Sequence, residues 1–138
     1  MAFELDPTLE SDSIWIADID NFTCRLINDS RYVWLVLVPT MDEVTEIYQL
    51  SPGLQRQLAD LSAALGEELM TLYQGHSFNV AAIGNVVRQL HIHHIVRHEN
   101  DAAWPAPVWG HSPAVPYDQD DAQSRVQCLR QSLSIFDN

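Results

Sequence analysis

The chain of 138 residues contains no lysine, and its seven arginines face 19 acidic residues, which gives a formal net charge of -12. Nucleic acids and anionic membranes attract clustered cations, so this balance excludes non-specific binding to either. A small anionic ligand remains compatible with the composition, because such a ligand needs only local hydrogen-bond donors.

Cysteine and long apolar runs are also scarce. Cys24 and Cys128 form no CxxC pair, which argues against a disulfide framework and a cysteine zinc site. The longest apolar run, residues 32–39, is too short to cross a bilayer. Residues 1–12 are acidic and lack the cationic and apolar regions of a secretory signal. We therefore expect a cytoplasmic protein with reduced thiols.

The length and a hydrophobic content of 46% indicate one globular domain, residues 1–138. A short helix is expected after Asp6, with Pro7 in its first turn. Period-two and apolar patterns predict three strands joined by short polar turns, at residues 13–19, 22–27 and 33–38. Strands joined by such turns form an antiparallel meander, and the third strand, stopped by Pro39, is expected to be central.

A long helix follows Ser51-Pro52, because leucines recur at steps of three and four up to Leu72, before Gly75. Two more strands are expected at residues 77–83 and 90–96, connected at Gly84-Asn85. A last amphipathic helix is expected near the C-terminus, with its apolar side at Val126, Leu129, Leu133 and Phe136. The order of these elements predicts an α+β domain.

Four of the six histidines lie within residues 91–98. Side chains alternate along a strand, so Gln89, His91 and His93 are expected on one face. His94 falls on the opposite, apolar face, where we expect a buried histidine with satisfied hydrogen bonds. Arg97, at the end of the strand, is expected to pair with carboxylates, to close the site or to form a surface salt bridge. Trp34 is expected in the core.

The pair His91 and His93 fits three roles on the residues alone. Imidazole is a common transition-metal ligand, and His94 or His98 could supply a third nitrogen. Alternatively, one imidazole attacks phosphorus while its neighbour donates to the phosphate oxygens. The third role is structural, with both rings hydrogen-bonded in a half-polar sheet.

This segment resembles the signature of the histidine triad (HIT) family of nucleotide hydrolases and transferases, His-φ-His-φ-His-φ-φ, where φ is apolar. Placing Arg97 on the family's arginine aligns His91 with the middle histidine and His93 with the last. Gln89 then stands in place of the first histidine. The resemblance covers residues 13–97, and the remainder, residues 98–138, is expected to be a variable C-terminal loop and helix.

Other positions extend the resemblance. The family's glycine turn before the triad is matched by residues 84–87, Gly-Asn-Val-Val. Asn79 matches an asparagine that precedes this turn, and Asn28 matches one that contacts the nucleotide. The resemblance thus implies that Asn28, Asn79, Gly84 and Asn85 bind nucleotide or phosphate.

The resemblance implies a HIT-like fold with an antiparallel sheet of about five strands, one long helix and a C-terminal helix, assembled as a homodimer. It implies hydrolysis or nucleotidyl transfer on nucleoside phosphates, phosphoramidates or dinucleoside polyphosphates. His91 would form a covalent nucleotidyl-histidine, and His93 would donate to the phosphate oxygens. No cofactor and no protein-bound metal are implied, and a divalent cation would enter only with the substrate phosphates.

Gln89 departs from the family pattern. A carboxamide cannot exchange a proton near neutral pH, so we expect catalysis by Gln89, His91 and His93 to be slow. Two rival hypotheses remain, namely a non-catalytic nucleotide-binding or sensor protein and a histidine metal-binding domain. If the glutamine marks a degraded enzyme, Gln89→His is expected to restore turnover.

Overall fold

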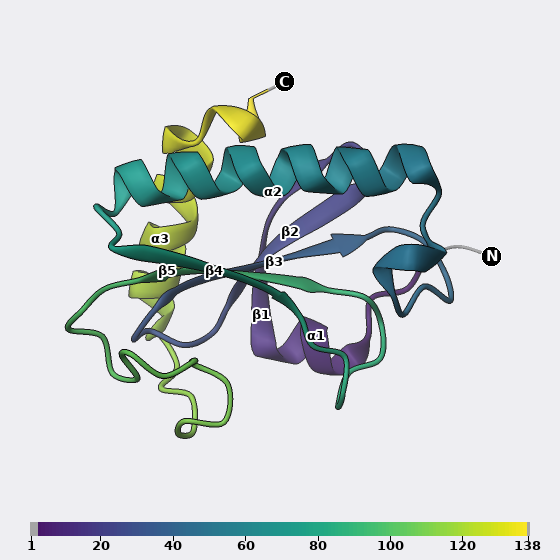
Figure 1. Cartoon of the computed structure of the whole chain (residues 1–138). Helices are drawn as coiled ribbons and strands as arrows, with labels where there is room; N and C mark the ends of the chain where they lie inside the picture. Colours follow the sequence, from purple (N-terminus) through teal and green to yellow (C-terminus); the bar gives the residue numbers. More distant parts are fainter. Residues whose placement is uncertain (1–2, 138) are drawn as a thin grey trace.

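The computed structural model describes residues 3–137. Its centre is a five-stranded antiparallel sheet in the order β1-β2-β3-β5-β4, seen nearly edge-on in Figure 1. The strands are β1 (Ser13–Ile19), β2 (Phe22–Ile27), β3 (Val33–Pro39), β4 (Ser77–Ala82) and β5 (Ile92–Arg97). The predicted meander, the central position of β3 and the α+β HIT-like fold are confirmed.

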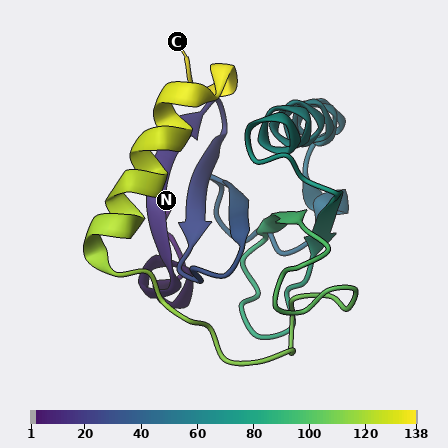
Figure 2. The ribbon, with the colours of Figure 1, turned by 90° about the vertical axis from the view of Figure 1, so that its left-hand side faces the viewer.

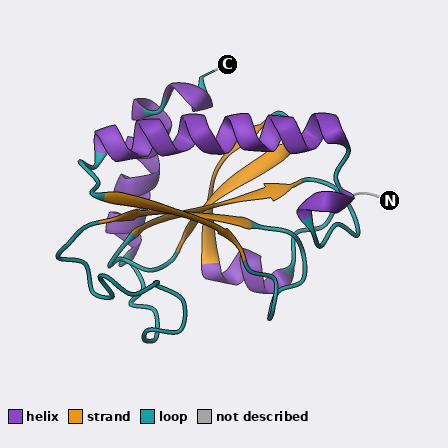
Figure 3. Ribbon diagram, in the orientation of Figure 1, coloured by secondary structure: helices purple, strands orange, loops and turns teal. Residues whose placement is uncertain are grey.

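Helix α2 (Pro52–Leu72) lies along one face of the sheet (Figure 3). Ser51 caps it by accepting a hydrogen bond from the Leu54 N–H, and Pro52 opens its first turn, as the sequence predicted. The leucine stripe buries Leu58, Leu65 and Leu69 in the main core. Gly66 allows close packing, because a Cβ there would lie 2.8 Å from the Phe78 ring.

Helix α3 (Gln119–Ser132) packs on β1 and contributes Val126 and Leu129 to the same core (Figure 2). The expected continuation of this helix to Phe136 is wrong, because the helix ends at Ser132 and a short 3-10 turn, η2 (Ser134–Phe136), follows. A second such turn, η1 (Ile47–Gln49), precedes α2. Among the described residues, no helix is long and apolar enough to cross a membrane.

The opposite face of the sheet is covered by short segments rather than by a long helix. Helix α1 (Pro7–Asp12) is capped by the Asp6 side chain and buries Leu9 against Val36 and Val38. The loop after β5 covers the rest of this face, where Ala103 and Val108 pack against Ile95. A segment near the N-terminus and the loop between β5 and α3 therefore cover this face.

Strand β5 starts at Ile92 rather than at residue 90, and residues 83–91 form an irregular connection instead of a tight turn. Gln89 and His91 consequently lie just outside the strand. His94 points towards α2, where its Nε2 lies 2.8 Å from Ser62 Oγ and its Nδ1 lies 2.9 Å from the Ile92 carbonyl oxygen. The prediction of a buried, hydrogen-bonded His94 is confirmed.

The fold should therefore become less stable in mild acid. Burial lowers the pKa of His94 from 6.5 to about 4, so between these values the unfolded chain binds a proton that the folded chain excludes. His94 alone should reduce the free energy of unfolding by about 1.4 kcal/mol per pH unit as the pH falls through this range. Urea titrations of the wild type and His94→Gln at several pH values measure this slope.

The exposed histidine variant His111→Gln is the control and should keep the wild-type slope. A wild-type slope in His94→Gln as well would contradict a neutral, buried His94.

Candidate active site

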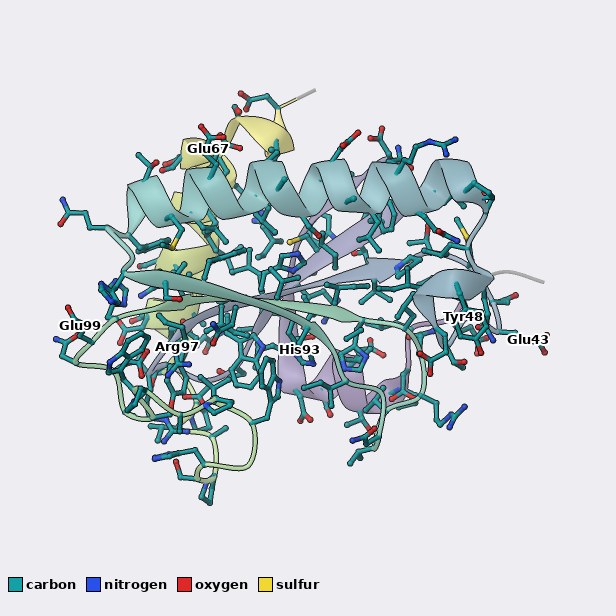
Figure 4. All side chains as sticks on the ribbon, in the orientation of Figure 1. Glu43, Tyr48, Glu67, His93, Arg97 and Glu99 are labelled. Atoms are coloured by element: carbon teal, nitrogen blue, oxygen red, sulfur yellow. The ribbon has the colours of Figure 1, made fainter. Side chains whose placement is uncertain are left out.

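A cleft of about 520 Å³ opens on the face of the sheet opposite α2. His91 and His93 lie in it, and Figure 4 shows His93 on the side of the sheet away from α2. Helix α1, the end of β2 and the segment before α3 form its walls. The lining residues are Thr8, Leu9, Ser11, Asp12, Ile27, Asn28, Trp34, Val87, His91, His93, Ala114 and Pro116.

The ring of His91 is oriented by the backbone that precedes it. Its Nδ1 lies 2.7 Å from the Gln89 carbonyl oxygen, which can only accept a hydrogen bond. Nδ1 therefore carries the proton, and in the neutral ring Nε2 keeps a free lone pair. His91 is 5% exposed, so this nitrogen is sheltered but reachable from the cleft.

The ring of His93 is held in the opposite tautomer. Trp34 Nε1–H can only donate, and it donates to His93 Nδ1 at 2.9 Å. Burial, with the neighbouring His91 and His94, lowers the pKa of His93 to about 3, so the ring is neutral at physiological pH. Its proton therefore sits on Nε2. The two ring centroids are 4.8 Å apart, so a ring with a lone pair on Nε2 neighbours a ring with a proton on Nε2.

Trp109 closes the other side of His93, with ring centroids 5.3 Å apart. It belongs to the loop after β5, and that loop is held by a buried ion pair. Arg97 Nε and Nη2 donate to the two carboxylate oxygens of Asp101 at 2.8 and 3.0 Å, and Nη2 also donates to the Ala106 carbonyl oxygen. The loop is thus fixed to the end of β5.

Arg97 is only 1% exposed, so the expectation of a surface salt bridge is wrong. Burial raises the pKa of the Asp101 carboxyl, but hydrogen bonds from Arg97, His98 and Trp104 outweigh it and hold that pKa below its ordinary value. Removing one partner of such a pair costs about 3–5 kcal/mol, because the other charge stays buried without compensation.

Comparisons with known proteins agree with this geometry. The sequence model described as HIT domain matches residues 8–100. A histidine triad protein from Marinobacter aquaeolei is 41% identical over 96% of this chain and 97% of its own, with a TM-score of 0.93. Histidine triad proteins from Sinorhizobium meliloti and Bradyrhizobium japonicum are 36% and 35% identical, cover 95% and 96% of this chain and 97% and 99% of their own, and both have a TM-score of 0.91. No curated protein matches the chain.

The chain belongs to the histidine triad (HIT) family.

The solved HIT structures match nearly the whole chain, whereas the HIT domain model stops at residue 100. The overlap therefore extends over most of the segment that follows β5. In this HIT protein that segment reaches the cleft through Ala114 and Pro116. Part of the region that the sequence analysis expected to be a variable C-terminal loop and helix therefore forms one wall of the cleft.

Of the asparagines and the glycine that the resemblance assigned to nucleotide or phosphate binding, not all lie near the two histidines. Asn28 lines the cleft, and its Oδ1 accepts from the Tyr117 N–H at 2.9 Å. Asn79 instead accepts from Arg97 Nη1 at 2.9 Å and lines a separate hollow of about 490 Å³. Gly84 and Asn85 belong to the connection before β5, of which Val87 and His91 line the cleft.

The Gln89 side chain also turns away from the two rings. Its amide hydrogen-bonds to the backbone of Glu4 and Asp6 rather than to His91 or His93. Alternation predicted the face of Gln89, since Leu90 and Ile92 pack in the main core and α1 lies on the other face, but it did not predict the partners of the amide. A further hollow, about 630 Å³ between β1 and α3, contains neither histidine.

Within residues 3–137, no three histidine, cysteine or acidic side chains gather closely enough to hold a metal ion. The two histidines suggested as a third ligand are occupied elsewhere. His94 lies on the other face against Ser62, and His98 Nε2 lies 2.9 Å from the Tyr73 carbonyl oxygen. This arrangement counts against the metal-binding interpretation.

Trp34 is the functional candidate that sequence reasoning missed. It lies in an apolar run, which predicts core packing, and nothing local indicates that its indole reaches His93. The contact becomes visible only in the pairing of β3 with β5. Val36 stands opposite His93 there, and Trp34, two residues earlier on the same face of β3, is the diagonal neighbour of His93. Trp34 is therefore one of the residues that define the chemistry of this HIT site.

Trp34→Phe should release the tautomer of His93. Without the indole donor, Nδ1 can take the proton, and the neutral ring should populate both tautomers at a stability cost of about 1 kcal/mol. The ¹⁵N chemical shifts of the His93 ring nitrogens measure the tautomer directly.

Trp109→Phe is the matched control, because among the described residues its buried Nε1–H has no hydrogen-bond partner. This variant should keep the wild-type tautomer. An unchanged His93 tautomer in Trp34→Phe would contradict the assignment.

Proposed function

We propose that this HIT protein is a nucleotide phosphohydrolase or nucleotidyl transferase that uses His91 as its nucleophile. One observation carries the proposal: two neighbouring imidazoles in a single cleft, with ring centroids 4.8 Å apart, are held in opposite tautomers, so that His91 has a lone pair on Nε2 and His93 has a proton there. Phosphoryl chemistry needs this combination of a nucleophile and a donor for the developing charge. The substrates are nucleoside phosphoramidates, dinucleoside polyphosphates or related nucleoside phosphates.

The reaction has two displacements at the α-phosphorus. His91 Nε2 forms a P–N bond as the bond to the leaving group breaks. A polyphosphate departs as an anion, and an amine takes a proton from solvent. Water then attacks the nucleotidyl-histidine and loses its proton to solvent. The P–N bond breaks, and its electron pair returns to His91. His93 Nε2–H donates to a non-bridging phosphate oxygen in both steps.

The walls of the cleft support binding of a nucleoside monophosphate unit. Of the lining side chains within the described residues, only Asp12 carries a formal charge. Phosphate recognition therefore uses neutral donors, including Nδ2 of Asn28, whose Oδ1 is already engaged. Leu9, Ile27 and Val87 offer apolar contacts for a base.

We assign the protein no resident cofactor, and a divalent cation enters only with substrate phosphates. We place it in the cytoplasm, which is consistent with its two free cysteines. We further propose a homodimer across β4, an edge strand that exposes half of Val80. Light scattering after gel filtration measures the mass that this arrangement requires.

The covalent intermediate provides the direct test. Intact-protein mass spectrometry after a brief acid quench with an adenosine phosphoramidate should detect a nucleotidyl adduct on the wild type. His91→Ala should form none and should lose about a thousandfold or more in kcat/KM. His94→Gln, on the other face of β5, should form the adduct like the wild type.

Absence of both adduct and product, with AMP still bound, would overturn the hydrolase proposal. That result would favour the non-catalytic nucleotide-binding protein.

Asn28 allows binding to be separated from structure. Asn28→Asp keeps an acceptor for the Tyr117 N–H but removes the Nδ2 donors, so AMP affinity should fall about tenfold with stability nearly unchanged. Asn28→Ala should lose both, with about 1 kcal/mol less stability. Calorimetric titration with AMP and urea unfolding measure the two effects. Wild-type AMP affinity in Asn28→Asp would remove Asn28 from the binding site.

A further inference from the structure

Both polar atoms of the Gln89 carboxamide form hydrogen bonds with the backbone of the segment before α1. Its Nε2–H donates to the Glu4 carbonyl oxygen at 2.9 Å, and its Oε1 accepts from the Asp6 N–H at 2.8 Å. The two backbone atoms belong to residues two positions apart, so one amide satisfies both. In this respect the side chain substitutes for a neighbouring strand.

Asp6, whose N–H donates to the Gln89 side chain, is the N-cap residue of α1. Asp6 accepts a hydrogen bond from the Thr8 N–H and thereby caps the helix. Thr8, Leu9, Ser11 and Asp12 of α1 then line the cleft. The position of Asp6 therefore determines where this wall of the cleft stands.

The backbone of Gln89 acts on the opposite side. Its carbonyl oxygen accepts the Nδ1–H of His91 at 2.7 Å and orients that ring. One residue thus contacts the nucleophile through its main chain and the facing wall through its side chain. The separation between His91 and α1 depends on both sets of bonds.

We propose that Gln89 is a positioning residue that sets the width of the nucleotide cleft by anchoring the N-terminal segment. It is not a degraded triad histidine. The N–H and the oxygen of a carboxamide can point in nearly the same direction, whereas the N–H and the lone pair of an imidazole point away from each other on either side of Cε1. Histidine cannot replace both bonds, so Gln89→His should impair the site. The part of this inference that concerns nucleotides rests on the proposed function.

The experiment compares the wild type with Gln89→Ala and Gln89→His. Hydrogen exchange by mass spectrometry follows residues 3–12, and kcat, KM and AMP affinity are measured with an adenosine phosphoramidate and AMP. Both variants should speed exchange of this segment about tenfold or more. KM and the Kd for AMP should rise about tenfold with kcat within about threefold, because His91 keeps its backbone partner.

Gln55→Ala is the matched control. Its amide also donates to a backbone carbonyl, that of Leu50 at 2.9 Å, but at the start of α2 and outside the residues lining the cleft. It should leave exchange of residues 3–12 and the kinetics of turnover unchanged. If Gln55→Ala changed exchange and turnover as the two Gln89 variants do, the effect would reflect a general loss of folding stability rather than the anchoring of residues 3–12.

Two results would overturn the proposal. One is wild-type exchange of residues 3–12 in Gln89→Ala, and the other is a higher kcat in Gln89→His than in the wild type. Failure of the proposed function gives a different result, because the wild type itself would then neither turn over the phosphoramidate nor bind AMP. In that case the exchange rates alone decide whether Gln89 anchors the segment.

Discussion

Strand β5 is buried along its whole length, and each of its polar side chains therefore needs a partner. A buried strand covered on both faces is usually apolar, but this one carries two imidazoles and a guanidinium. Each finds its partner on a different element: Trp34 on β3 for His93, Ser62 on α2 for His94, and Asp101 in the following loop for Arg97. These hydrogen bonds hold β3, α2 and the following loop to β5.

The same need for partners keeps the buried charge of Arg97 away from the two histidines of the cleft. The guanidinium of Arg97 serves the scaffold, since it binds Asp101, Asn79 and the loop backbone. Among the described residues that line the cleft, none is an arginine. In a chain with a net charge of -12, the proposed phosphate substrate would be recognised by directional N–H groups rather than by a basic surface. Fixed tautomers at His91 and His93 supply such directionality.

Local patterns predicted the strands, α2 and the opposite faces of His93 and His94, because each depends on neighbours a few residues away. The resemblance of residues 89–97 to a known signature predicted the family. The partners of Gln89, Trp34 and Arg97 could not be predicted in this way. Gln89 and Trp34 bond to partners 85 and 59 residues distant, and the partner of Arg97 depends on how a loop folds back. Such contacts have no signature in a single sequence.

The walls of the cleft come from segments far apart in the sequence, α1 and residues 114–117, and this affects when the site can form during synthesis. The bond from the Tyr117 N–H to Asn28 spans 89 residues, and the bond between Asp6 and Gln89 spans 83. The β1–β3 meander can form while the ribosome is still translating, but α1 has no anchor until Gln89 emerges. The opposite wall waits for residues 112–117. A nascent chain therefore exposes no finished cleft until most of the polypeptide has left the exit tunnel.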